Sequence, residues 1–268
     1  MTKVRLLLDK GTNFYFHVLC VSYARKGYSG EEYRKKYKKF VPKKVVSSFK
    51  RIPRKEVYNK LYCYKDFKEA KEKLKRKRKL LEEAESKSKS GFEKIWPEQY
   101  KKLKKFKSHF GKFWNRYESR ILKSIERVSG EKFGQKELKF YLTLPTHDAF
   151  ECFYGGRVIG NDYFFASMVL IHEIAHVNLE KLRKEIKLSK SKKYALEELL
   201  VDLITFSICR KIFGEKKGVE ICPIKGEHRY WLDYLFLWEL FLKNNKFDKF
   251  VKLLVYDFKT KRVSFIAD

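Results

Sequence analysis

The stretch VLIHEIAHV, residues 169–177, determines how the rest of this sequence is interpreted. Two histidines and one glutamate are its only polar residues, although 36% of the chain is charged. The apolar run covers about 163–182 and follows Asn161 and Asp162, a favourable N-cap pair, so it predicts a buried helix. Two imidazoles and a carboxylate inside such a helix need partners, because burying polar groups without them costs several kcal/mol.

The spacing of these polar residues indicates a metal site. His172, Glu173 and His176 form an H-E-x-x-H pattern. Residues four apart on a helix are neighbours, so both imidazoles can bind one ion. Glu173 lies about 60° around the helix axis from His176, where it can take a proton from a water whose pKa zinc lowers toward 7. We therefore predict His172 and His176 as zinc ligands and Glu173 as the general base.

A third ligand is expected on the next helix, residues 192–212. Glu198 and Asp202 share one face of this helix, since they are four residues apart. We expect Glu198 to complete a site of two histidines and one glutamate. Asp202 is expected to accept the free ring N–H of a ligand histidine, with His172 preferred. Glu197 remains a rival ligand, but only Glu198 has an aspartate four residues later.

Together the two motifs resemble those of the gluzincins, the thermolysin-like zinc metallopeptidases. Their short spacing is most similar to that of the small archaeal minigluzincins. The resemblance covers residues 138–210. It implies a zincin-like catalytic domain, with a small sheet, an active-site helix and a glutamate helix. It also implies one Zn²⁺ ion and hydrolysis of peptide bonds in a peptide or protein substrate.

The resemblance extends to substrate binding and to the oxyanion. In the family, the edge strand of the sheet holds the substrate antiparallel. A hairpin is expected at 149–159, turning at Gly155-Gly156, so residues 149–154 are the candidate edge strand. The expected substrate contacts are Phe150, Cys152 and Tyr154. Larger gluzincins stabilise the oxyanion with a downstream histidine and tyrosine, and the candidates for this catalytic role, on chemistry alone, are His228 and Tyr230, with Tyr194 as a further one.

The remaining segments predict an α+β, mainly helical fold. A helix is expected at 12–26, capped by Thr12 or Asn13, although this segment could also be a strand. A hinge is expected at the polar segment SKSKSG, residues 86–91. Helices are expected at 12–26, at 31–52 in pieces broken at Pro42 and Pro53, and at 64–86, 92–129, 192–212, 230–243 and 246–254, with a strand at 138–144. We expect two domains: a basic, helix-rich region at 1–112 and the gluzincin-like domain at 113–268.

The charge balance predicts a second kind of partner. The chain has 63 Lys and Arg against 33 Asp and Glu, a net charge of +30. The lysine-rich composition resembles that of hyperthermophile proteins, but lysine exceeds the acids by more than heat adaptation explains. Such an excess attracts polyanions, and residues 64–113 are the expected surface for nucleic acid or an acidic protein. The alternative is a basic surface with no dedicated partner.

Targeting signals and cysteine patterns in the sequence indicate the cellular location of the protein. We find no secretory signal, no apolar stretch of about 18 residues and no C-x-x-C pair, so a cytoplasmic protein without a transmembrane segment is expected. The alternative function is a catalytically silent zincin-fold scaffold that binds nucleic acid or an acidic partner through its basic helices. An intact Glu173 disfavours this alternative. A coiled coil is also disfavoured, because Leu74, Leu80 and Leu81 are too sparse for heptads.

Overall fold

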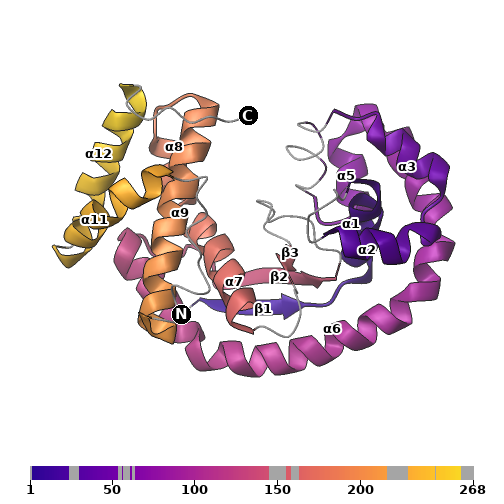
Figure 1. Cartoon of the computed structure of the whole chain (residues 1–268), viewed down its shortest axis with the longest axis horizontal. Helices are drawn as coiled ribbons and strands as arrows, with labels where there is room; N and C mark the ends of the chain where they lie inside the picture. The colour runs from indigo at the N-terminus through magenta and orange to yellow at the C-terminus, as the bar shows by residue number, and fades with distance from the viewer. Residues whose placement is uncertain are drawn as a thin grey trace. The chain divides into compact units, whose positions relative to one another are not determined.

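The structure of the chain, a computed structural model, is mainly helical with one small sheet, which confirms the expected α+β class (Figure 1). It describes residues 2–23, 30–53, 56, 61, 64–144, 155–157, 163–215, 229–244 and 246–260. The elements are β1 (Lys3–Leu7), α1 (Lys10–Tyr23), α2 (Gly30–Tyr37), the 3₁₀ helix η1 (Lys38–Phe40), α3 (Lys43–Lys50), α5 (Phe67–Lys73), the 3₁₀ helix η3 (Lys75–Lys77), α6 (Arg78–Ser129), β2 (Glu137–Thr143), β3 (Gly155–Arg157), α7 (Tyr163–Asn178), α8 (Glu180–Glu185), α9 (Lys190–Phe213), α11 (Arg229–Lys243) and α12 (Phe247–Lys259). Among the described helices, none is both long enough and apolar enough to cross a membrane.

The chain forms two compact units, and each is discontinuous in sequence. One unit contains residues 1–3, 115–136 and 170–268, and the other contains 4–114 and 137–169. The domain boundary expected after residue 112 falls inside α6, which continues as a helix to Ser129. The division into domains 1–112 and 113–268 remains a prediction.

In the unit that includes residues 4–114, α1 forms the centre of the core. Every residue from Thr12 to Ser22 is buried, as expected for a helix surrounded by other elements. The cap of this helix is Asp9, not Thr12 or Asn13: the Asp9 carboxylate accepts hydrogen bonds from the Thr12 backbone N–H and hydroxyl, both at 2.6 Å. Asn13 instead donates to the Leu142 carbonyl at 3.0 Å and so ties α1 to β2.

The sheet has the strand order β1-β2-β3, and β2 pairs with β3 in parallel. Tyr141 lies opposite Gly155, and Leu142 lies opposite Gly156. The hairpin turn expected at Gly155-Gly156 is therefore wrong: both glycines are strand residues, and a parallel pair requires a crossover rather than a tight turn. The expected edge strand at 149–154, with Phe150, Cys152 and Tyr154, lies outside the described residues.

Helix α6 continues through the segment where a hinge was expected. The SKSKSG residues are helical, and one face of α6 is buried here, through Ser88 in the segment and Phe92 and Ile95 just after it. Gly91 allows a close approach instead of a bend: a Cβ atom there would lie 2.1 Å from the Phe40 carbonyl oxygen. The helix expected at 64–86 is interrupted instead at Leu74, which has φ −105° and ψ 63°.

Two glycines of α6 provide a matched test of this close approach. Gly91→Ala should lower the free energy of unfolding by about 1–3 kcal/mol, because the added methyl group meets backbone that cannot move aside cheaply. Gly111→Ala has nothing within 4 Å of the new Cβ and should raise it by about 1 kcal/mol through helix propensity. Urea denaturation of both variants measures the difference. Equal effects at the two positions would show that the contact with Phe40 carries no constraint.

The buried His17 on α1 is held in its neutral form. Gln99 donates to the Tyr33 hydroxyl oxygen at 2.8 Å, so the Tyr33 proton is free to donate to His17 Nδ1, 2.9 Å away. Among the described residues, His17 Nε2 has no hydrogen-bond partner. Burial lowers the pKa of His17 from 6.5 to about 3.

His17 should therefore make stability depend on pH. The unfolded chain binds a proton at His17 below about pH 6.5 and the folded chain does not, so stability is lost as the pH falls from there toward about 3. His17→Asn keeps an acceptor for Tyr33 but does not titrate. The stability advantage of wild type over this variant should shrink by up to about 1.4 kcal/mol per pH unit. Denaturation of both proteins between about pH 7 and pH 4 measures it; a constant difference would contradict a neutral buried imidazole.

Candidate metal centre

Helix α7 supplies the histidines of the site, and its burial matches its sequence. The residues flanking the motif are buried, with Ile171, Ile174 and Ala175 fully so. The end of the helix is anchored by Asn178, whose amide donates to the Glu131 carbonyl at 2.9 Å. The expectation of a buried helix is confirmed, and the helix ends at Asn178 instead of about residue 182.

Helix α9 supplies the carboxylates and is supported on its other side by α11 and α12 (Figure 1). It ends before Gly214, as expected, where φ is +88° and a side chain would be strained. The indole N–H of Trp238 on α11 donates to the Ser207 hydroxyl at 2.7 Å. This packing places one face of α9 against the C-terminal helices and leaves Glu198 and Asp202 to face α7.

His172, His176 and Glu198 converge on one point. The Nε2 atoms of His172 and His176 are 3.2 Å apart. The Glu198 carboxylate lies 3.6 Å from His172 Nε2 and 3.4 Å from His176 Nε2. All three ligand atoms are within 4.8 Å of one another. Two nitrogen donors and one carboxylate oxygen are the donor set of a catalytic zinc site, so the residues present fit this metal.

A separate carboxylate holds the Nδ1 atom of each imidazole. Asp202 Oδ1 lies 3.3 Å from His172 Nδ1, and Glu197 Oε1 lies 3.0 Å from His176 Nδ1. A carboxylate at Nδ1 favours the tautomer with its proton there, and in that tautomer the Nε2 lone pair is directed at the common point. The contact of Asp202 is the one expected from the sequence. Glu197, left open as a rival ligand, is instead the Nδ1 partner of His176.

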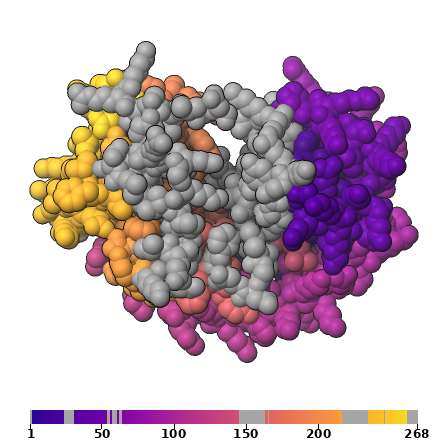
Figure 2. Space-filling model, in the orientation of Figure 1, coloured from indigo at the N-terminus to yellow at the C-terminus, as the bar shows by residue number. Residues whose placement is uncertain are grey.

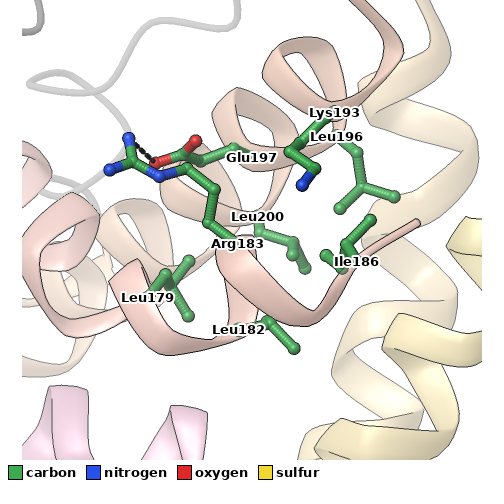
Figure 3. A pocket seen from close by; sticks show the side chains of 8 residues that line it. All are labelled: Leu179, Leu182, Arg183, Ile186, Lys193, Leu196, Glu197 and Leu200. Atoms are coloured by element: carbon green, nitrogen blue, oxygen red, sulfur yellow. Dashed lines mark hydrogen bonds and ion pairs between the residues drawn. The ribbon is translucent and has the colours of Figure 1, made fainter. Parts of the chain in front are cut away.

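The contact of Glu197 with His176 was not expected from the sequence, which left Glu197 open as a rival ligand. It is 4% exposed, and its Oε1 also lies 3.4 Å from an Arg183 guanidinium nitrogen (Figure 3). Figure 3 shows this pair beside a small pocket whose lining includes Leu182 of α8 and Leu196 and Leu200 of α9. The adjacent pair Glu197-Glu198 could have indicated this contact. Neighbouring residues on a helix point about 100° apart, so the two carboxylates cannot both bind the same ion in the same way.

The carboxylates raise the pKa of both imidazoles. Burial acts to lower the pKa of His172, but hydrogen bonds with Asp202 and Glu198 outweigh it and raise it well above its ordinary value. Burial also opposes charge on His176, and hydrogen bonds with Glu197 and Glu198 raise its pKa to about 9. For Glu198, burial acts to raise the pKa, but both histidines hold it far below its usual range. The cluster thus favours positive charge at its centre.

Glu173 lies beside the convergent residues and is nearly buried, at 5% exposure. Its charge contributes to the raised pKa of His172. Tyr194 is on α9 one turn before Glu198 and is 48% exposed. His228 and the side chain of Tyr230 lie outside the described residues, so the oxyanion candidates stay untested predictions.

Comparison of the chain with protein-family models, with curated proteins and with solved structures found no match.

The Nδ1 contacts generate a prediction for metal affinity. Asp202→Ala and Glu197→Gln should each weaken zinc binding about 10- to 100-fold, because the imidazoles lose the group that orients them and raises their basicity. Competition with a chromophoric chelator measures the affinity, and circular dichroism checks the fold. Glu185→Gln, at an exposed position of α8, is the control with the same change of charge as Glu197→Gln. Unchanged affinity in both site variants would contradict these roles.

Proposed function

We propose that this chain is a zinc-dependent peptidase of the gluzincin type. His172, His176 and Glu198 hold one Zn²⁺ ion, and Glu173 acts as the general base. The observation that carries this proposal is the paired arrangement around the histidines: both Nε2 atoms face Glu198, and each Nδ1 faces its own carboxylate. Two histidines that only packed in a core, without a metal, would need no such division of their nitrogen atoms.

The reaction assigned to this site is hydrolysis of a peptide bond. A bound zinc ion would supply a Lewis acid that polarises the carbonyl and lowers the pKa of water. Glu173 accepts a proton from the attacking water and returns it to the leaving nitrogen, and the second proton of the water follows, so that the peptide bond breaks into a carboxylate and an ammonium group. Asp202 and Glu197 hold the two imidazoles in place and do not touch the substrate.

The number of ligands favours catalysis over a structural role. Structural zinc sites are usually closed by four protein ligands, whereas catalytic sites use three and keep one position open. Across the part of the chain that the structure describes, the cluster has three members. Glu173 adds a buried carboxylate that a scaffold would not require, which supports the peptidase over the scaffold alternative.

Glu173→Gln tests the proposal. The substitution keeps size and hydrogen bonding but removes the base, so zinc should still bind with a stoichiometry of about one. Turnover should fall by about 10²- to 10⁴-fold, the usual contribution of general-base catalysis. The assay is cleavage of unfolded casein by zinc-loaded protein, with chelator abolishing it and Glu185→Gln as the control. A zinc-loaded wild-type protein that cleaves no member of a broad peptide library would overturn the peptidase assignment in favour of the scaffold.

A further inference from the structure

Helix α6 changes its electrostatic character along its length. Its first half pairs lysine or arginine with glutamate four residues away, as in Arg78–Glu82, Glu83–Lys87 and Glu98–Lys102. Residues 99–117 then contain six lysines and one arginine and no acidic residue at all. Glu98 pairs with Lys102 of this stretch, and the stretch contains no carboxylate of its own.

Four lysines of this helix recur at spacings that place them on one face of it. Lys94, Lys101, Lys105 and Lys112 are separated by 7, 4 and 7 residues, and 18 residues make five complete turns. All four are exposed, and no carboxylate pairs with any of them within the described ranges. The line is about 27 Å long at 1.5 Å per residue. We call these four residues the basic ridge.

The opposite face of the same helix segment is buried. Leu103, Phe106 and Phe110 are at most 7% exposed and lie about half a turn around the axis from the ridge lysines. Packing of this apolar face keeps the segment rigid and directs the ridge to solvent, and α6 is open to solvent along the lower edge of Figure 2. The four lysines are thus held at fixed positions along the helix, so binding requires no further ordering of the backbone.

We propose that the basic ridge binds the phosphate backbone of a nucleic-acid duplex, independently of sequence. A duplex carries one negative charge per about 1.7 Å of its axis, so a line of about 27 Å meets several phosphates at once. Lysine ammonium groups suit this contact as point charges. Each phosphate contact releases condensed counterions, and this release drives the association.

Other polyanionic partners fit the ridge less well. A membrane-surface helix inserts a free apolar face, whereas the apolar face of this segment is packed into the core. Protein interfaces are depleted in lysine and depend on aromatic or arginine anchors, and the ridge contains neither. A single strand would need exposed aromatic rings for stacking along the ridge, and the line itself is made of lysines.

The basic block Lys71–Lys79, which charge alone favours as a binding surface, is partly neutralised in the structure. Lys71 pairs with Glu85 at 2.6 Å, and Lys77 pairs with Glu56 at 3.2 Å. Arg78 pairs with Glu82 at 2.8 Å. These ion pairs reduce the charge available to an external phosphate, so the ridge is the stronger candidate within residues 64–113.

The test compares two variants of the full chain that lose the same charge. The ridge variant carries Lys94→Gln, Lys101→Gln, Lys105→Gln and Lys112→Gln. The control carries Lys10→Gln, Lys35→Gln, Lys44→Gln and Lys139→Gln, at exposed lysines outside α6 that each pair with a glutamate. Glutamine has nearly the helix propensity of lysine, so the fold of the ridge variant should be preserved. Binding of fluorescein-labelled DNA and RNA duplexes is followed by anisotropy over a range of salt concentrations.

Wild type should bind both duplexes with a steep salt dependence. The ridge variant should lose about 3–4 from the slope of log K against log salt, whereas the control should lose less than about 1. Equal losses in both variants would show that net charge alone acts, and would overturn the ridge. Absence of duplex binding by wild type at low salt, or ridge-dependent binding of anionic vesicles in its place, would also overturn it. Zinc content and casein cleavage report on the peptidase separately, so failure of either proposal is distinguishable.

Discussion

Polar side chains buried between two apolar helices must find partners there, and this requirement determines how α7 and α9 face each other. His176 is buried and His172 is partly buried, and aliphatic residues of α7 flank both. The four ring nitrogens of the two histidines are therefore contacted by carboxylates of α9, which belong to Glu197, Glu198 and Asp202. A small rotation of α9 would leave imidazole or carboxylate groups unpaired, at a cost of several kcal/mol each.

The helical positions of the three carboxylates determine which imidazole nitrogen each of them contacts. Glu198 and Asp202 are four residues apart and face one histidine on opposite sides of its ring. Glu197 points about 100° away from Glu198 and reaches the far nitrogen of the other histidine. Arg183 from α8 then balances the buried charge of Glu197. One inner carboxylate thus serves both imidazoles, while each imidazole has an outer carboxylate of its own.

Features set by spacing within one helix could be predicted from the sequence, and features set by contacts between distant segments could not. The convergence of His172 and His176 and the end of α9 at Gly214 follow from local periodicity and backbone preference. The role of Gly91 depends on the Phe40 carbonyl, about fifty residues earlier in the chain, so the same residue was interpreted as a hinge. Gly155-Gly156 has the composition of a turn, but parallel pairing with β2 makes it a strand.

The histidines of this chain also show which physical effect dominates at the site. His17 is buried among aromatic rings without a carboxylate, and its pKa falls to about 3. His176 is similarly buried, yet its pKa rises to about 9, because Glu197 and Glu198 contact its ring. Burial alone would therefore have made the site neutral, and the carboxylates reverse its effect. In a chain of net charge +30, this concentration of acidic groups around two imidazoles creates a local demand for positive charge, which a divalent cation satisfies with a single ion.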